Sequence, residues 1–214
     1  MYNIIMKMSY LHLLLFLVST LSACGNGFVV TWGNSLNGGD SSSVDVSSDV
    51  STIYSTDFAF AALKNNGSVV TWGSSNFGGD SSNVMEDLSS DVSTIYSTDY
   101  AFAALKNDGS VVTWGYSSWG GNSSSVDLSS GVSTIYSNGY AFAALKNDGS
   151  VVTWGKSGNG GDSSGVDLSS DVSTIYSTVS AFAALKNDGS VVTWGNSVNG
   201  GDSSGVDLSS DVST

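Results

Sequence analysis

Residues 101–115 read Ala-Phe-Ala-Ala-Leu-Lys-Asn-Asp-Gly-Ser-Val-Val-Thr-Trp-Gly, and this stretch recurs almost unchanged along a chain of 214 residues. Its second half begins at Val29, Val69, Val111, Val151 and Val191, at offsets of 40, 42, 40 and 40 residues. The offset of 42 comes from two extra residues near Met85. A fixed period in this range is typical of β-propellers, solenoids and other repeat arrays, so the repeat decides the fold class.

Each unit contains three short segments that predict β-strands. In one unit they are residues 92–97, 101–105 and 111–114, which are apolar and rich in β-branched and aromatic side chains. The tip Asn107-Asp108-Gly109 predicts a tight hairpin turn between the last two segments, because these residue types tolerate positive φ. Alanine favours helices, but five residues between two turn signals are too few for a stable helix.

The remainder of the unit is less regular. A short fourth strand is expected around residues 84–88, and at 166–168 in a later copy, whereas the segment before it is rich in Gly, Ser and Asn and predicts a loop. Three to four short strands per unit are typical of a propeller blade, and the alternative, a β-solenoid, usually has shorter rungs. We therefore expect an all-β, β-propeller-like array with blades of about 40 residues.

The repeat domain, residues 29–214, holds four complete units and a partial fifth. Counted from one Val-Val-Thr-Trp-Gly run to the next, they are 29–68, 69–110, 111–150, 151–190 and 191–214. The first unit lacks the strand that would precede Val29, and the last stops where Ile-Tyr-Ser should begin, so unpaired strand edges are expected at both ends. Three interpretations stay open: a fragment of a longer chain, closure or self-association through open blade edges, and a small or open, incomplete ring.

Residues 1–23 do not belong to the repeat and predict a secretory signal peptide. One lysine precedes an apolar run at 11–18, which is too short for a good transmembrane span, and small residues follow. The stretch Leu-Ser-Ala-Cys at 21–24 is similar to the lipobox of bacterial lipoproteins, in which the Cys receives a diacylglycerol; the alternative is an ordinary signal peptide that ends in Cys. We expect export, lipidation of Cys24, and a tether at residues 24–28 to the outer membrane or cell surface.

The units resemble the repeat of the regulator of chromosome condensation family, which runs Ala-Leu, two variable residues, Asp-Gly and an apolar strand ending in Trp-Gly. Residues 104–115 carry that pattern, which recurs at 62–73, 144–155 and 184–195, and the resemblance covers nearly everything after residue 27. It implies a β-propeller with four-stranded blades, in a ring that usually has seven of them.

The chain also departs from that family. Alanine stands where a His commonly precedes the Ala-Leu strand, as at Ala101, and Gly-Gly-Asp-Ser at residues 78–81 replaces Gly-Gln-Leu-Gly. The unit is shorter than the family's usual repeat. Guanine-nucleotide exchange on a small nuclear GTPase does not suit an exported protein, and light sensing requires Arg beside Trp clusters, whereas this chain has no Arg. The resemblance therefore implies the fold and no specific family activity.

The chain is strongly acidic, with 19 Asp and Glu against 6 Lys and a net charge of −13. This balance argues against a nucleic-acid groove and against anionic lipid headgroups, because both need clustered cations. Membrane contact is expected only through the lipid anchor. The only His, His12, and the only Cys, Cys24, lie in the leader or at its end. Nucleophilic sites with a His partner and Cys/His zinc sites are therefore excluded for the repeat domain.

Two alternatives rely on carboxylates. Weak candidates for Ca²⁺ ligands in the Gly-Gly-Asp-Ser loops are Asp80, Asp162 and Asp202; Ca²⁺ takes oxygen ligands and would give a calcium-stabilised structural or adhesive array. Turn chemistry explains the same residues. A carboxylate-based hydrolase is less favoured, because the carboxylates recur in each repeat whereas an active site is normally unique. We expect no enzymatic activity and no cofactor.

The positions that differ between units are the candidates for binding. One loop site reads Leu36, Phe77, Trp119, Asn159 and Asn199, and a pair of positions reads Asp57-Phe58, Asp99-Tyr100, Gly139-Tyr140 and Val179-Ser180. Loops on a rigid scaffold commonly carry function, although neutral drift explains such variation equally well. The repeated Trp is expected to pack between blades, with an aromatic sugar-binding surface as the alternative. We expect a non-enzymatic scaffold that presents its loops to a protein or glycan.

Overall fold

The computed structural model describes residues 27–210, and within them twelve β-strands form four three-stranded antiparallel sheets. The first sheet holds β1 (Val50–Ser55), β2 (Ala59–Lys64) and β3 (Val69–Gly73), and the second holds β4 (Val92–Ser97), β5 (Ala101–Lys106) and β6 (Val111–Gly115). The third holds β7 (Val132–Ser137), β8 (Ala141–Lys146) and β9 (Val151–Gly155), and the fourth holds β10 (Val172–Ser177), β11 (Ala181–Lys186) and β12 (Val191–Gly195). The strands predicted at 92–97, 101–105 and 111–114 are confirmed, as are their counterparts in the other three sheets, whereas the equivalent run at 29–32 forms no strand.

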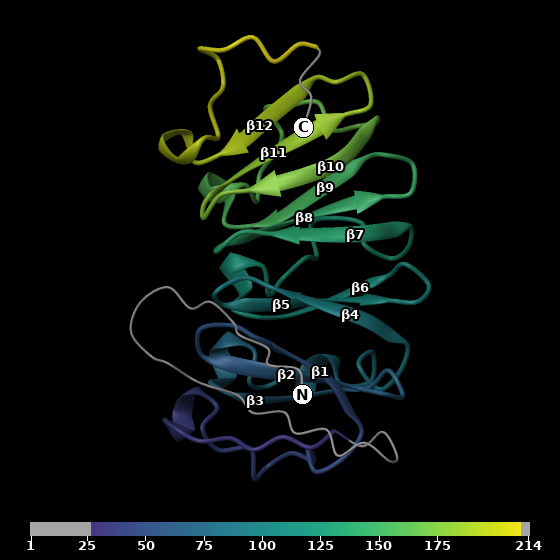
Figure 1. The fold of residues 1–214 in the computed structure, drawn as a ribbon, viewed down its shortest axis with the longest axis vertical. Helices are drawn as coiled ribbons and strands as arrows, with labels where there is room; N and C mark the ends of the chain where they lie inside the picture. The colour runs from purple at the N-terminus through teal and green to yellow at the C-terminus, as the bar shows by residue number, and fades with distance from the viewer. Residues whose placement is uncertain (1–26, 211–214) are drawn as a thin grey trace.

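The sheets stack along the longest axis of the molecule and do not close into a ring (Figure 1). The first strands of successive sheets contact one another. Tyr54 Oη and Thr94 Oγ1 lie 3.2 Å apart across one such junction, and Ser97 Oγ donates to the Ser55 carbonyl at 2.8 Å. The protein is therefore an open, propeller-like, all-β array. No helix within residues 27–210 is long and apolar enough to span a membrane.

Short 3-10 turns lie outside the strands, in the connections between sheets, before the first strand and after the last one. They are η1 (Ser35–Asn37), η2 (Ser75–Phe77), η3 (Ser82–Val84), η4 (Ser117–Trp119), η5 (Ser157–Asn159) and η6 (Ser197–Asn199). Five of them follow a Trp-Gly, and each of these five is followed directly by a glycine in the left-handed region, for example Gly120 with φ of 112°.

The fourth strand of each blade, expected around residues 84–88 and 166–168, is absent from the described part of the chain. Leu88 is buried, and its carbonyl accepts a bond from the Val69 amide at 2.9 Å, but no further rung follows. Serine and aspartate side chains take the neighbouring backbone groups instead: Asp167 accepts from the Ser169 amide at 3.0 Å. Such local bonds compete with a strand ladder, so the blades have three strands.

Each sheet combines two sequence units. The unit at 69–110 supplies β3 to the first sheet and β4 and β5 to the second. The hairpin β2–β3 therefore crosses the junction between consecutive Val-Val-Thr-Trp-Gly units. Its counterpart β5–β6 turns as the sequence predicts: the Lys106 amide bonds the Ser110 carbonyl at 2.9 Å, and Gly109 has φ of 81°. A single αL glycine in the turn is typical of longer hairpin loops.

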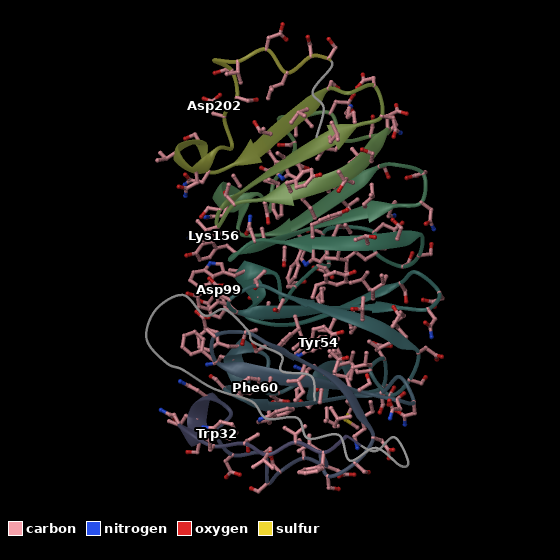
Figure 2. All side chains as sticks on the ribbon, in the orientation of Figure 1. Trp32, Tyr54, Phe60, Asp99, Lys156 and Asp202 are labelled. Atoms are coloured by element: carbon pink, nitrogen blue, oxygen red, sulfur yellow. The ribbon has the colours of Figure 1, made fainter. Side chains whose placement is uncertain are left out.

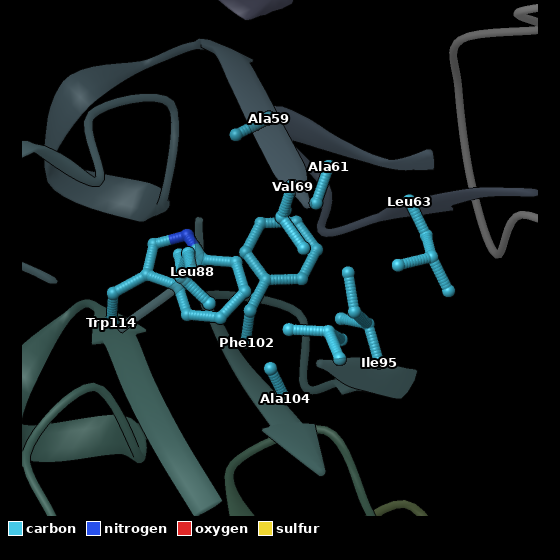
Figure 3. Packing of buried hydrophobic residues seen from close by; sticks show 10 residues of the cluster. Ala59, Ala61, Leu63, Val69, Leu88, Ile95, Phe102, Ala104 and Trp114 are labelled. Atoms are coloured by element: carbon cyan, nitrogen blue, oxygen red, sulfur yellow. The ribbon is translucent and has the colours of Figure 1, made fainter. Parts of the chain in front are cut away.

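The core lies between the sheets, and the middle strand of each sheet is buried on both faces. Ala59 and Ala61 of β2 face the second sheet, from which Phe102, Ile95 and Trp114 pack against them (Figure 3). Alternate residues of the same strand, Phe60 and Ala62, face the other way. Burial on both faces explains why Ala-Phe-Ala-Ala-Leu reads as an unbroken apolar run.

The repeated tryptophans pack between blades, as predicted. Trp72, Trp114, Trp154 and Trp194 are each at most 4% exposed. Each stacks on the Phe of its own sheet and donates its indole N–H to a glycine carbonyl of the preceding turn; for Trp154 the acceptor is Gly120, at 3.1 Å. Trp32, at the end of the described stack, is the exception at 42% exposure. The sugar-binding alternative therefore fails for the four buried rings.

Candidate functional site

The variable loop site lies at the end of the 3-10 turns. Phe77, Trp119, Asn159 and Asn199 are the last residues of η2, η4, η5 and η6. In η1 the last residue is Asn37, and Leu36 stands one position earlier, 75% exposed. The equivalent of Phe77 in the first unit is therefore Asn37, and the sequence-based choice of Leu36 was one residue out of register.

A buried hydroxyl brings the two variable sites together. Thr98 Oγ1 accepts bonds from the amides of Tyr100 and Ala101 at 3.2 and 3.0 Å, and it donates to the Trp119 carbonyl at 3.3 Å. The turn before β5 is thereby fixed to η4. Thr56 makes the same link to Phe77 at 3.2 Å in the first sheet. Thr favours such side-chain-to-backbone bonds in turns, so each variable pair lies beside the variable loop of its own blade.

Backbone hydrogen bonds then align the variable pairs of successive blades. The Asp57 amide donates to the Asp99 carbonyl at 3.0 Å, the Asp99 amide to Gly139 at 3.2 Å, and the Gly139 amide to Val179 at 3.1 Å. These bonds join residues 40 or more positions apart in sequence. They form a ladder of hydrogen bonds along the stack. The residue after each ladder position is therefore aligned with its counterpart in the next blade; these residues are Phe58, Tyr100 and Tyr140.

Six rings form a continuous surface that we call the aromatic strip. Its members are Phe58, Phe77, Tyr100, Tyr116, Trp119 and Tyr140, whose neighbouring centroids lie 4.2 to 6.0 Å apart. Trp119 meets the rings of Tyr100 and Tyr140 nearly edge-on, at 4.2 and 5.6 Å. Tyr116 is 40% exposed and the other five rings are partly exposed. The strip ends at the fourth blade, where Ser180 takes the place of a ring.

Charges of opposite sign lie near the strip. Lys156 Nζ lies 5.2 Å from the ring centroid of Trp119 and 5.0 Å from that of Tyr140, within the range of cation–π attraction. Asp57 and Asp99 immediately precede Phe58 and Tyr100. Figure 2 shows Asp99 and Lys156 on the same side of the stack. Burial, together with the charge of Asp57, raises the pKa of Asp99 to about 6, and burial raises the pKa of Asp57.

Asp99 is expected to make the protein less stable as the pH rises from about 4 to about 6. Its pKa is higher in the folded state, so the native protein binds more protons than the unfolded chain in this window, and ionisation costs stability. Asp99→Asn should remove this loss and be the more stable form at neutral pH. Urea unfolding across the window measures it; parallel pH profiles for the two proteins would contradict the assignment.

The structure does not bring the other residues proposed from the sequence together into a site. Asp80, Asp162 and Asp202 each accept a bond at 2.9 Å from the amide two residues later, and this bond lowers their pKa. They lie in separate turns, and within residues 27–210 no group of three or more His, Cys, Asp or Glu side chains is placed to hold a metal ion. Cys24, the lipidation candidate, and the leader lie outside the described residues.

Two members of the site were missed from the sequence. Tyr116 and Lys156 follow Trp-Gly directly, at a position that reads Asn34, Ser74 and Asn196 in the other units. This variation was the available signal. Its importance emerges only in the fold, because Tyr116 contacts both Phe77, from the preceding turn, and Trp119, from its own turn.

Comparison with known proteins leaves the family of the chain open. No family model and no curated protein matches the chain. Similar solved structures include Prp20p from Saccharomyces cerevisiae (16% identity, TM-score 0.49, 79% of this chain and 48% of that chain) and the CRINKLY WD40 ectodomain of the Arabidopsis thaliana receptor kinase ACR4 (18%, 0.49, 79% and 64%). Human WBSCR16 is 19% identical with a TM-score of 0.48, over 82% of this chain and 57% of that one. The chain thus spans less than two thirds of each of these proteins.

Proposed function

We propose that this protein is a non-enzymatic repeat scaffold that binds a protein partner through the aromatic strip. The observation that carries the proposal is that sequence variation between the blades and the clustering of exposed rings fall at the same place in the fold. The blades are nearly identical in sequence, and three of the positions at which they differ are gathered by the fold into one surface of six adjoining, partly exposed rings. Aromatic residues are enriched at the centres of protein interfaces and at their energetic hot spots.

The scaffold supports this role because it holds the strip rigidly. Thr98 fixes the turn before β5 to η4, and the ladder from Asp57 to Val179 fixes each blade to the next. Rings that are ordered before binding lose little conformational entropy when a partner arrives. A large aromatic surface on a preformed edge is therefore suited to recognition by display.

The strip is expected to be the point of partner contact in crosslinking. Tyr116 replaced by the photoreactive analogue p-benzoylphenylalanine should yield a specific adduct with the native partner. The same replacement at Tyr176, which is 55% exposed but lies outside the strip, is the matched control and should yield none. Trp119→Ala, introduced together with the analogue at Tyr116, should abolish the adduct. Equal adducts at both positions would refute the proposal, and an adduct with a carbohydrate would turn it toward a glycan partner.

We also propose that the protein is exported and anchored by lipid at Cys24, on the strength of the signal-like leader and the Leu-Ser-Ala-Cys sequence. An anchor with two or more acyl chains would hold the scaffold stably at the cell surface. Labelled palmitate should be incorporated into the protein expressed in a bacterial host, and Cys24→Ser should abolish incorporation. Labelling that survives this substitution would refute lipidation at Cys24.

A further inference from the structure

We propose that the aromatic strip receives a basic segment of the partner protein, with an arginine or lysine side chain held between the rings and the carboxylates of Asp57 and Asp99. This inference rests on the proposed function and adds the chemistry of the partner. Three observations support it: a pair of carboxylates without a compensating cation, a cation already seated on the rings, and the charge of the whole chain.

The two carboxylates stand apart from most aspartates of the chain. Within residues 27–210, neither Asp57 nor Asp99 pairs with a cation or accepts a side-chain hydrogen bond, whereas Asp108, for example, accepts from both the amide and the hydroxyl of Ser110 at 2.9 and 2.7 Å. Asp99 is half-buried, and the charge of Asp57 adds to the rise of its pKa. A guanidinium or ammonium group would relieve both the burial cost and the repulsion.

Each of the two carboxylates lies in a blade that also contributes a ring to the strip. Aspartate occupies this position of the ladder only before Phe58 and Tyr100, and the later blades have Gly139 and Val179 there. An added Cβ at Gly139 would lie 2.8 Å from Asp99 Oδ2, so the carboxylate lies against the backbone that leads into Tyr140. A cation bound at Asp99 would therefore be close to the strip.

The position of Lys156 indicates that the rings of the strip can bind a cation. Its ammonium lies about equally far from Trp119 and Tyr140, at 5.2 and 5.0 Å, and no other unit has a lysine at this position. It lies on rings of the second and third blades, whereas the two carboxylates come from the first and second blades. The Lys156 ammonium therefore occupies the ring faces that a cation of the partner would bind, and its removal should make these faces available to that cation.

The net charge favours the same partner. With 19 acidic residues against 6 lysines, the protein attracts cationic segments over distance, which raises the association rate. An acidic peptide would meet Asp57 and Asp99 as like charges. A neutral glycan would stack on the rings but would leave both carboxylates without a counter-charge.

The test measures the affinity of the intact protein for a fluorescein-labelled peptide in which arginine alternates with glycine. Asp57→Asn combined with Asp99→Asn is expected to weaken binding about tenfold. Asp162→Asn combined with Asp202→Asn removes the same charge from exposed turns and should weaken binding less than about twofold. Asparagine is tolerated at that turn position, because Asn122 makes the same bond in the third unit. Lys156→Ala should tighten binding about threefold.

The outcomes separate this inference from the proposed function. Equal losses in the two double variants would mean general charge attraction and would overturn the inference. No binding of the arginine peptide, or equal binding of a citrulline peptide or a neutral oligosaccharide, would also overturn it. In either case the crosslink from Tyr116 to the native partner would still stand as the test of the strip itself. Circular dichroism of each variant confirms that a loss of affinity is not a loss of folding.

Discussion

Phe102→Ala is expected to lower the free energy of unfolding by about 3–5 kcal/mol. The ring is fully buried, stacks on Trp114 with centroids 5.1 Å apart, and packs against Ala59 and Ala61 of the preceding sheet. Removing it loses the transfer free energy of a benzyl group and leaves a cavity between two sheets whose backbones cannot easily close it. Urea unfolding followed by tryptophan fluorescence measures the loss.

Phe58→Ala is the matched control for this substitution. The chemistry is identical, but Phe58 lies in the aromatic strip and is already partly exposed, so the expected loss is about 1 kcal/mol or less. Because blades contact only their neighbours in a linear array, Phe102→Ala should also broaden the transition as the first sheet uncouples from the others. Similar losses for the two variants would show that the inter-sheet core is not where stability resides.

Gly120→Ala is expected to cost about 2–4 kcal/mol. Two effects add. The residue has φ of 112°, where a side chain strains the backbone, and an added Cβ would lie 2.5 Å from Cε2 of Phe142 in the next sheet. The glycine is thus required both by the turn and by the close approach of the buried ring. Thermal and urea unfolding of the variant report the sum.

Gly200→Ala separates these two effects. Gly200 follows η6 directly with φ of 100°, but among residues 27–210 nothing lies within 4 Å of its added Cβ, and no Phe packs there. Only the backbone strain remains, and the expected cost is about 1–2 kcal/mol. The difference between the variants measures the contact of turn and ring. If the costs were equal, the turn would be free to move away from Phe142 without penalty.

The sequence determined the local elements of this protein. The strands, the hairpin at Asn107-Asp108-Gly109 and the buried position of Trp114 all follow from short-range patterns: apolar runs between turn residues, a glycine that supplies positive φ, and a ring at one fixed place in each unit. The all-β array follows from the period itself. These features depend on residues a few positions apart, which repeat with little change.

The tertiary structure alone decided how the units combine. Three strands form each blade because Ser and Asp side chains take the backbone groups of the expected fourth, and the third strand comes from the next unit. The aromatic strip exists because bonds from Thr98 and the ladder through Asp99 join residues about 20 and 40 positions apart. The raised pKa of Asp99 follows from burial and from Asp57 in the adjacent blade. Contacts between units are set by packing in three dimensions, and a pattern read within one unit does not contain them.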